Sequence, residues 1–406
     1  MNSPVDTWVA QQTGLFGNLN SETLRNWQIE KLKDLIKYAS ENTTFYQGKL
    51  NITDDITELP FTLPSDIARD PFAFLAIPQS EVARVTTLAN SGTTRLKKRI
   101  FFSEADIERT LNFFAVGMST MVSKGENAQI LLSNRTENSL GSLLKKSLSR
   151  IGVSSEISGA IKSVSAAINE SQYADCIIGM PDEIFFMCRT APELRPKSVL
   201  LAADYIPQAV IEGIKETWKC KVFSHYGHTE FGFGCAVDCD YHSGLHTRDA
   251  DLLFEIINPE TNKPVNQGDG GEIVITTLSN EAMPLIRYRT GNISSIINTS
   301  CECGSIIPRI GRIEGRFESN IQIGDGDTLT IHQLDEIIFA NPVVRGFNAS
   351  LGIQENKKSL QLIVDAFDKI DLNSLIAKLP KNVKIEIKYD NADPFIKREK
   401  RRIHIS

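Results

Sequence analysis

Residues 225–232 read His-Tyr-Gly-His-Thr-Glu-Phe-Gly and follow a short apolar run that ends at Phe223. A buried strand does not need His, Tyr, Thr and Glu in a row, and a solvated turn does not need an aromatic ring. A loop that holds a flat ring and a metal-bound phosphate does need them. Tyr226 can stack on a base, Glu230 can hold Mg²⁺, and the glycines let the backbone approach a ligand. This segment therefore predicts a nucleotide-binding loop.

The length and charge of the chain narrow the class of protein. Its 406 residues are too many for one ordinary core, so we expect two or more domains. The formal net charge of −6 argues against a general nucleic-acid binder. The sequence has no run of about 18 apolar residues that would span a membrane, and its N-terminus lacks the basic and apolar regions of a signal peptide. Seven cysteines in a chain of this length do not make a disulfide scaffold. The expected compartment is the cytoplasm.

Apolar strand-like runs alternate with amphipathic helical patterns in the first half of the chain. The alternation predicts a mostly parallel sheet with helices on both faces, in which ligands bind at the carboxyl ends of the strands. Ser21 is a plausible N-cap for the first helix. The predicted strands are 82–88, 100–102, 129–132, 176–179, 199–202 and 221–223, and the predicted helices are 21–39, 106–121, 143–151 and 206–218.

A second loop at a predicted strand end is Asn90-Ser91-Gly92-Thr93-Thr94. Small hydroxyl residues around a glycine expose backbone N–H and side-chain O–H donors together, as a polyphosphate requires. The loop is not a Walker A motif, and no Gly-x-Gly-x-x-Gly follows a strand, which argues against a nicotinamide-binding domain. The alternative interpretation is a polar hairpin loop. A third segment at a predicted strand end is Ala202-Ala203-Asp204.

The second half of the chain changes character twice. Strand patterns at 252–257, 271–277 and 293–297 between turn sequences predict a smaller antiparallel sheet. After Gly315-Arg316 the chain begins a new α+β pattern, with helices predicted at 331–339 and 372–379 and strands at 344–353, 359–365 and 383–389. The expected fold is α/β. It has a large N-terminal domain, residues 1–315, of parallel sheets plus a small antiparallel sheet. A small mobile α+β domain, residues 316–406, follows a hinge near Glu318.

Six segments occur in one order along the chain: Leu59-Pro60-Phe61-Thr62, Asn90-Ser91-Gly92-Thr93-Thr94, Ala202-Ala203-Asp204, Tyr226-Gly227-His228-Thr229-Glu230, Arg287-Tyr288-Arg289-Thr290-Gly291-Asn292, and Gly315-Arg316 with Glu318. This order resembles the adenylate-forming (acyl-CoA synthetase) superfamily, and within it the phenylacetate–CoA ligase family. The resemblance covers nearly the whole chain. Any one match is weak, whereas all six in order are specific.

The resemblance implies that a substrate carboxylate attacks the α-phosphate of ATP, releases pyrophosphate and forms an acyl adenylate. A thiol, expected to be coenzyme A, then attacks that adenylate after the small domain has rotated. The residues implied in catalysis are Glu230 and Thr94, which flank Mg²⁺, and a C-terminal lysine, Lys400 as first choice and Lys397 as second. The residues implied in nucleotide binding are Ser91, Gly92, Thr93, Thr94, Ala202, Ala203, Asp204, Tyr226, Gly227, Thr229, Asn292 and Arg316.

Three positions depart from the family pattern. Asn292 stands where an aspartate usually grips the ribose hydroxyls, so a charge-assisted hydrogen bond is lost. Arg95-Leu96-Lys97-Lys98 replaces the usual Gly-x-Pro-Lys after the phosphate loop, and the C-terminal lysine segment lacks the expected Gly-Lys pair. A catalytically impaired nucleotide-binding protein is therefore one alternative.

Four cysteines fall in two close pairs, 235/239 and 301/303, which indicates a metal site. Cys239 and His246 lie upstream of Cys301 and Cys303 with the Gly-Leu-His spacing of the phenylacetate–CoA ligase relatives. Three thiolates and one imidazole make a closed tetrahedral set suited to structural Zn²⁺. Cys235 and His242 are rival ligands, and free buried cysteines are the alternative interpretation.

The expected function is that of an AMP-forming ligase that activates an aryl or short acyl carboxylic acid with ATP and transfers it to coenzyme A. One alternative is adenylyl transfer without a thioester step, as in the deazaflavin-adenylating synthetase of the same family. The other is a nucleotide-binding scaffold. The expected partner is a small-molecule acid, with no nucleic acid and no membrane. Relatives are often dimers, so a homodimer is an option that the sequence does not test.

Overall fold

The structure of the chain is a computed structural model that describes residues 3–88, 97–316, 321–324, 327–354, 357–381, 383–390 and 401–405. The chain forms two compact units. The first unit consists of residues 1–120, 142–151 and 225–313, and the second consists of residues 121–141, 152–224 and 314–406. The predicted domain boundary between residues 315 and 316 and the hinge near Glu318 stay predictions, and Glu318 lies outside the described residues.

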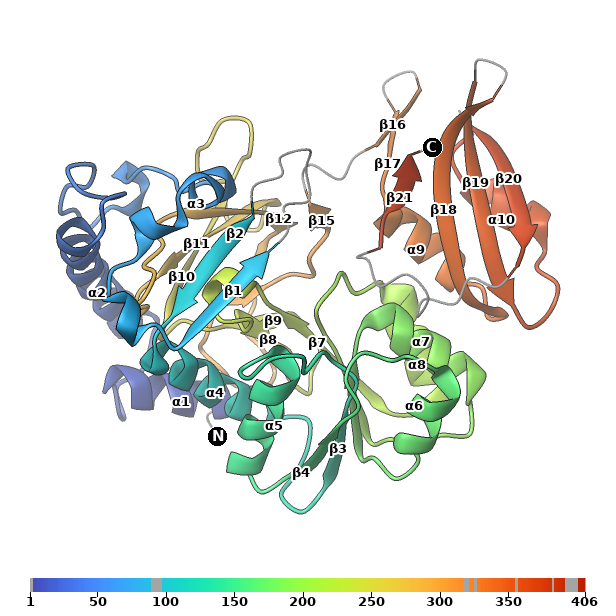
Figure 1. The fold of residues 1–406 in the computed structure, drawn as a ribbon, viewed down its shortest axis with the longest axis horizontal. Helices are drawn as coiled ribbons and strands as arrows, with labels where there is room; N and C mark the ends of the chain where they lie inside the picture. Colours follow the sequence, from blue (N-terminus) through green and yellow to red (C-terminus); the bar gives the residue numbers. More distant parts are fainter. Residues whose placement is uncertain are drawn as a thin grey trace. The chain divides into compact units, whose positions relative to one another are not determined.

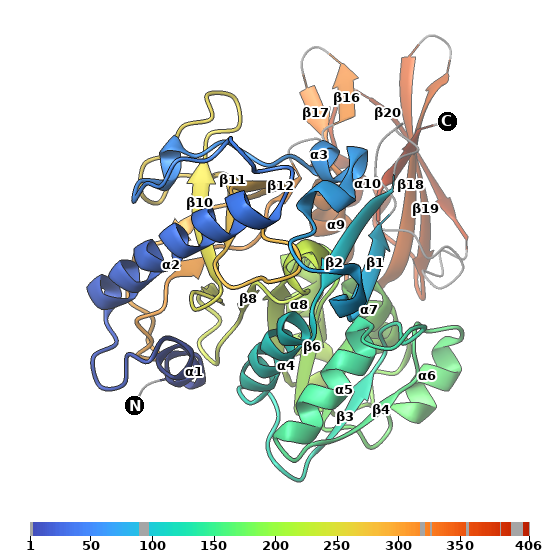
Figure 2. The ribbon, with the colours of Figure 1, turned by 60° about the vertical axis from the view of Figure 1, so that its left-hand side comes forward.

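The helices of the first unit are α1 (Pro4–Thr13), α2 (Ser21–Asn42), α3 (Pro64–Arg69), α4 (Glu104–Met118) and most of α5 (Leu140–Arg150), with short 3-10 helices at Ile56–Glu58, Pro71–Phe74, Gln79–Glu81 and Thr229–Phe231. Figure 2 shows the whole length of α2. Its N-cap is Asn20, whose side chain accepts hydrogen bonds from the amides of Glu22 and Thr23. The predicted cap, Ser21, is wrong by one residue, because an asparagine in extended conformation already satisfies these amides.

The strands of the first unit are antiparallel. β1 (Arg84–Leu88) pairs with β2 (Lys98–Phe102), and β10 (Leu252–Ile257), β11 (Gly271–Thr277) and β12 (Tyr288–Ser294) form one sheet. β8 (Ala236–Val237), β9 (Leu245–Thr247), β14 (Arg309–Ile310) and β13 (Ile296–Ile297) follow in that order. The predicted small antiparallel sheet is confirmed. The predicted strand 293–297 is divided between β12 and β13. β12 begins five residues before the predicted start. Its first residues are mostly polar, so the sequence did not mark them as a strand, although every second one is buried.

The second unit contains the predicted parallel sheet. Its strands follow the order β4 (Ser154–Ile157), β3 (Asn127–Ile130), β5 (Cys176–Gly179), β6 (Ser198–Leu201) and β7 (Lys221–Tyr226), and all neighbours are parallel. β5 and β6 are buried at every position, as central parallel strands are. The helices beside them are α6 (Val164–Glu170), α7 (Pro181–Thr190) and α8 (Gln208–Trp218). The sequence analysis missed β4, α6 and α7, although Pro181 followed by two acidic residues is a helix-start signal.

The C-terminal part of the second unit has the predicted α+β composition. β15 (Gly315–Arg316), β16 (Ile321–Gly324) and β17 (Asp327–Leu329) precede α9 (Ile331–Phe339). β18 (Val344–Gln354), β19 (Lys357–Ala366), β20 (Lys384–Tyr389) and β21 (Ile403–Ile405) form a sheet in the order β20-β19-β18-β21, and α10 (Leu372–Lys378) connects β19 to β20 (Figure 1). Phe339 of α9 lies 5.0 Å from Phe185 of α7, between ring centroids, so this part shares a hydrophobic core with the helices of the parallel sheet.

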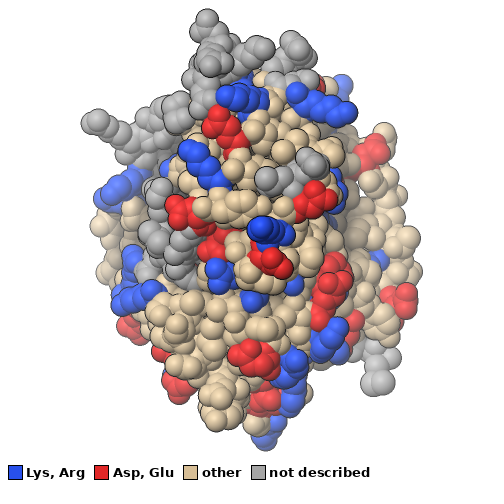
Figure 3. Space-filling view, turned by 90° about the vertical axis from the view of Figure 1, so that its right-hand side faces the viewer, with Lys and Arg blue, Asp and Glu red and all other residues tan. Residues whose placement is uncertain are grey.

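Within the described part of the chain, none of the helices has the length and apolarity that a bilayer crossing requires. Figure 3 shows basic and acidic side chains scattered among other residues on one face of the molecule. This mixture fits the small negative net charge of the sequence.

Candidate functional site

The loop at 225–232 begins inside a strand. β7 was predicted to end at Phe223, but it continues to Tyr226, and His225 and Tyr226 pair with β8. The next residue must be glycine, since a Cβ at Gly227 would lie 1.7 Å from the carbonyl oxygen of Phe233. Gly232 has φ +78°, in the region that favours glycine. The glycines therefore permit a tight loop that folds back on itself.

Glu230 is the centre of this loop and is 1% exposed. Its Oε1 accepts hydrogen bonds from Lys98 Nζ at 2.5 Å and from the Tyr288 hydroxyl at 2.7 Å. Its Oε2 lies 2.5 Å from Nδ1 of His228. Lys98 Nζ is also 3.1 Å from the Tyr288 hydroxyl, so the four side chains make one network.

The charges of this network favour an ionised carboxylate. Burial raises the pKa of Glu230, but His228 and Lys98 outweigh burial and hold the pKa well below its ordinary value. An ionised carboxylate is the kind of anionic oxygen ligand that a metal cation requires, and in this structure the Lys98 ammonium occupies its Oε1. The sequence analysis named Glu230 but assigned no role to Lys98 or Tyr288.

His225 lies on the strand beside Tyr226, and its side chain has no polar partner in the described part of the chain. Both of its ring nitrogens are buried and have no hydrogen-bond partner among the described residues. Its ring meets that of Phe114 of α4 edge to face, at 6.2 Å between centroids. Burial lowers the pKa of His225 to about 4, so the ring is neutral at pH 7.

We expect His225 to make stability depend on pH. The unfolded histidine binds a proton below its ordinary pKa of about 6.5, whereas the folded one does so only near pH 4. Stability is therefore lost as the pH falls from about 6.5 to about 4, by about 2 kcal/mol between pH 7.5 and pH 5. Urea unfolding of His225→Gln at both pH values should lack this decrease, whereas His404→Gln should keep it. Equal decreases in His225→Gln and wild type would contradict the assignment.

The segment 287–292 places two buried polar side chains around β12. Arg287 is 3% exposed and donates to Glu255 at 2.8 Å and to the carbonyls of Thr57 and Leu59. Asn292 is 7% exposed, and its Oδ1 has no hydrogen-bond partner among the described residues. An orphaned buried acceptor of this kind fits a hydroxyl donor such as that of a ribose.

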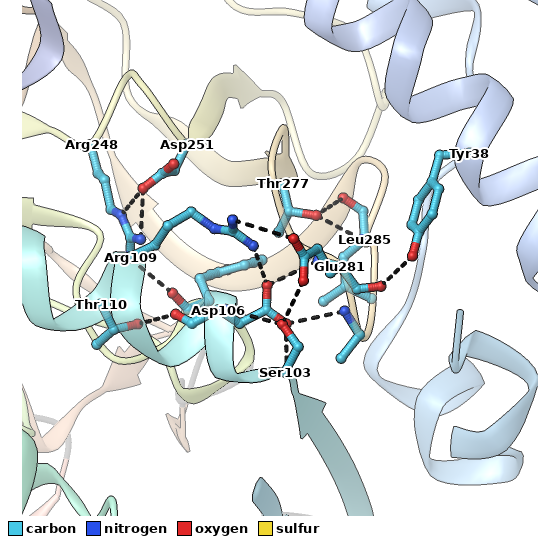
Figure 4. A network of polar contacts seen from close by, with 12 residues as sticks. Tyr38, Ser103, Asp106, Arg109, Thr110, Arg248, Asp251, Thr277, Glu281 and Leu285 are labelled. Carbon is cyan, nitrogen blue, oxygen red and sulfur yellow. Dashed lines mark hydrogen bonds and ion pairs between the residues drawn. The ribbon is translucent and has the colours of Figure 1, made fainter. Parts of the chain in front are cut away.

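A buried polar network fixes the start of α4 against the segment that precedes β12 (Figure 4). Asp106 accepts hydrogen bonds from the amides of Glu281 at 2.9 Å and Ala282 at 3.1 Å. Arg109 pairs with Asp106 at 2.6 Å, and Tyr38 donates to the Glu281 carbonyl at 2.9 Å. Ser103 and Asp106 form a capping box, which is a sequence signal for the start of α4.

The predicted adenine-contact segment lies in the second unit. Ala202 follows β6 and is buried, whereas Ala203 is exposed with φ +73°, a rare backbone conformation for alanine. Asp204 Oδ2 accepts from the backbone amide of Arg401 at 3.4 Å, and Arg401 pairs with Asp335 at 2.6 Å. Arg316 is exposed at the end of β15.

Several predicted residues lie outside the described part of the chain. They are Ser91, Gly92, Thr93, Thr94, Lys397 and Lys400. Their assigned roles in phosphate binding and catalysis stay predictions.

The structure brings the four predicted metal ligands together. One ligand atom each from Cys239, His246, Cys301 and Cys303 lies within 4.8 Å of the others. The sulfurs of Cys239 and Cys301 are 3.7 Å apart, and Cys303 Sγ is 3.3 Å from His246 Nε2. The donor set of three sulfurs and one imidazole nitrogen fits a tetrahedral Zn²⁺ ion. Cys235 is buried outside this group.

The residues around this cluster orient its ligands. His246 Nδ1 donates to the Ile307 carbonyl at 3.1 Å, which leaves Nε2 free for a metal. Ser243 Oγ lies 3.5 Å from Cys301 Sγ. Burial raises the pKa of the Cys239 thiol to about 12. Burial also acts on Cys301, but hydrogen bonds from Ser243 and the Cys303 amide outweigh it and bring that pKa to about 6. His242, the rival imidazole, pairs with Asp238 at 2.8 Å.

Comparison with known proteins supports one family. No protein-family model matches the chain. The phenylacetate-coenzyme A ligase of Thermus thermophilus is 29% identical over 354 residues, 80% of this chain and 77% of the relative. That of Escherichia coli is 25% identical over 344 residues, 78% of this chain and 76% of the relative. The crystal structure of a 2-hydroxyisobutyryl-CoA ligase with R3-HIB-AMP has a TM-score of 0.78 at 18% identity, covering 92% of this chain and 88% of the other.

The fold, the ordered motifs and these relatives agree. The fold is that of the solved CoA ligase structure, and the sequence is similar to the phenylacetate-coenzyme A ligases over more than three quarters of the chain.

Proposed function

We propose that this chain is an ATP-dependent, AMP-forming acid–CoA ligase whose substrate is an aryl or short acyl carboxylic acid. The acid carboxylate attacks the α-phosphorus of ATP, the bond to the bridging oxygen of pyrophosphate breaks, and an acyl adenylate forms. The coenzyme A thiolate then attacks the acyl carbon and releases AMP. The relatives named phenylacetate-coenzyme A ligase support this reaction class.

The observation that carries the proposal is the buried, ionised Glu230 within the matching motif. Glu230 would hold Mg²⁺, and the ion would supply neutralisation of the phosphate charge. Lys98 and the Tyr288 hydroxyl hold the carboxylate in position through Oε1. Positioning and charge stabilisation supply most of the rate in phosphoryl transfer.

The nucleotide roles follow the resemblance residue by residue. Tyr226, with Gly227 and Thr229, contacts the adenine, and Asn292 accepts from a ribose hydroxyl. Ala202, Ala203 and Asp204 also contact the adenine, and Arg316 contacts the ribose. Ser91, Gly92, Thr93 and Thr94 bind the phosphates, and Lys400 binds the substrate carboxylate and a phosphate oxygen. The orphaned Oδ1 of Asn292 supports its role, since a bound hydroxyl would satisfy that buried acceptor.

The test is pyrophosphate exchange into ATP with a panel of aryl and short aliphatic acids, with and without coenzyme A. We expect exchange that depends on the acid, and a thioester product that appears only with coenzyme A. Exchange without any thioester would instead favour adenylyl transfer to another acceptor. ATP binding without exchange on any acid would contradict the ligase proposal and favour a nucleotide-binding protein, in which Asn292→Asp is the first variant to make.

A further inference from the structure

Arg248 is a buried arginine of the first unit that neither the sequence motifs nor the proposed reaction uses. It is 3% exposed. Its guanidinium pairs with the Asp251 carboxylate through Nε at 2.7 Å and Nη2 at 2.6 Å. The remaining nitrogen, Nη1, donates to the carbonyls of Phe231 and Gly234 at 3.4 Å each. Arg248 therefore holds the loop that directly follows Glu230.

Arg248 adds to other contacts of that loop, among them the Glu230 network and the packing of the Phe231 ring against Tyr288 at 5.6 Å between centroids. Phe231 and Phe233 each donate their amide to the His228 carbonyl, so the hydrogen bonds are local. Gly232 lies close to α4, where a Cβ would come within 2.3 Å of Thr110 Oγ1. Phe233 has φ +72°, which a bulky residue rarely adopts. A loop with such a backbone needs outside support, and the Arg248 guanidinium supplies hydrogen bonds on both sides of Gly232 and Phe233.

The same arginine lies at one end of the hairpin that carries two metal ligands. Ala236 pairs with Thr247, and Val237 pairs with His246. Toward the turn of this hairpin, which connects β8 to β9, Cys239 joins His246 in the metal cluster. On the other side, the Arg248 amide donates to the Cys235 carbonyl at 2.9 Å. The metal cluster and Arg248 therefore fix the two ends of one short hairpin.

We propose that Arg248 is a positioning residue that couples occupancy of the Cys239–His246–Cys301–Cys303 cluster to the position of the Glu230 loop. A metal bound to Cys239 and His246 locks the register of β8 and β9, and this register places the Arg248 guanidinium under the Phe231 and Gly234 carbonyls. Loss of the metal loosens the hairpin and with it the Glu230 loop. The cluster is then part of the catalytic scaffold and not only a structural staple.

The proposed coupling can be measured by combining metal removal with a substitution of Arg248. Coupling between two sites in proteins is typically about 5- to 150-fold. Metal removal and an Arg248 substitution must then be non-additive, because each removes the same link. Arg248→Met alone would leave the buried Asp251 carboxylate unpaired, so the test variant is R248M/D251N.

The matched control is Arg109→Met. Arg109 is also largely buried, pairs with the buried carboxylate of Asp106 at 2.6 Å, and belongs to the neighbouring network in Figure 4. No hydrogen bond between the described atoms of Arg109 and the 229–235 loop is present. Asp106 keeps the amides of Ser103, Glu281 and Ala282 as donors when Arg109 is removed, so this control needs no second substitution. It therefore tests the loss of a largely buried arginine without the loss of the proposed link.

The measurement is amide hydrogen exchange of the full chain, with zinc bound and after chelation, for wild type, R248M/D251N and Arg109→Met. We expect chelation to speed exchange at the amides of residues 231–235 by about 10-fold or more in wild type and in Arg109→Met. In R248M/D251N, exchange there is already fast with zinc bound, and chelation adds less than about 3-fold. The amides of β11, such as those of Ile273 and Ile275, report global unfolding.

Two results would overturn the proposal. One is an equal effect of chelation on residues 231–235 in R248M/D251N and wild type, because the two changes would then be independent. The other is slow exchange in zinc-bound R248M/D251N. If chelation also speeds exchange at the β11 amides, the protein unfolds globally without zinc. The proposal is then tested by comparing R248M/D251N with Arg109→Met in the zinc-bound state, which needs no metal removal.

An activity readout separates positioning from substrate binding. This arm alone rests on the proposed function, whereas hydrogen exchange needs no turnover. With an accepted acid, R248M/D251N should lower kcat by about 10-fold or more with KM for the acid within about 2-fold, as expected when only the reacting geometry is lost. Arg109→Met should change neither. If no acid supports turnover, the ligase proposal fails. The hydrogen-exchange result still tests the role of Arg248, because it does not depend on turnover.

Discussion

Glu230→Gln is expected to lower acid-dependent pyrophosphate exchange by at least about 100-fold. The substitution keeps the shape of the side chain but removes its charge. The largely buried Lys98 ammonium, 2.5 Å away, then loses its counter-ion, and a metal cation loses an anionic ligand. The Tyr288 hydroxyl keeps an acceptor, so the packing of the loop should survive. The measurement is the exchange rate at saturating ATP and acid.

A control must separate lost chemistry from lost stability, because breaking a buried ion pair destabilises by about 3 to 5 kcal/mol. Asp365→Asn is suited to this. Asp365 is 5% exposed, lies on β19 and pairs with Arg345 at 2.5 Å. We expect both variants to unfold at lower urea concentration, with only Glu230→Gln losing exchange. Exchange by Glu230→Gln within 10-fold of wild type would remove Glu230 from the reaction.

The parts of this fold that could be predicted are those with a local signal. The central strands β5 and β6 are short, mostly apolar runs without polar alternation. Such runs are typical of strands that are buried on both faces of a sheet. α9 was predicted with the ends that the structure has, and its Thr330–Gln333 capping box is a local signal that marks its start. β12 was misplaced because its pairing with β11 decides its start, and its letters resemble a polar loop.

The residues of the candidate site also differ in whether a local sequence signal marks them. Glu230 could be found because its neighbours along the chain make a recognisable motif. Its partners could not, since Lys98 lies 132 residues away and Tyr288 lies 58 residues away, and only the fold brings them together. Arg248 carries no motif at all. Its role depends on carbonyl groups of the backbone, which every residue has and which no sequence pattern marks.

The metal cluster leads to the second large expected effect. Purified protein should contain about one zinc ion per chain, and Cys301→Ala should lose it, because three remaining ligands leave the tetrahedral set open. A ligand present at 100 times its dissociation constant stabilises the folded state by about 2.7 kcal/mol. We therefore expect Cys301→Ala to lower the stability of the first unit by at least this amount, and chelation of wild type to do the same. Elemental analysis and thermal unfolding are the measurements.

Cys235→Ala is the matched control, and it also tests the rival ligand. Cys235 is fully buried and lies four residues from Cys239, but it is not part of the cluster. Both substitutions remove one buried thiol, so the packing losses are similar, while only Cys301→Ala removes a metal ligand. Cys235→Ala should keep the zinc and respond to chelation as wild type does. Zinc lost from Cys235→Ala and retained by Cys301→Ala would reverse the ligand assignment. Absence of zinc from wild type that has been supplied with the metal would leave these cysteines as free core thiols.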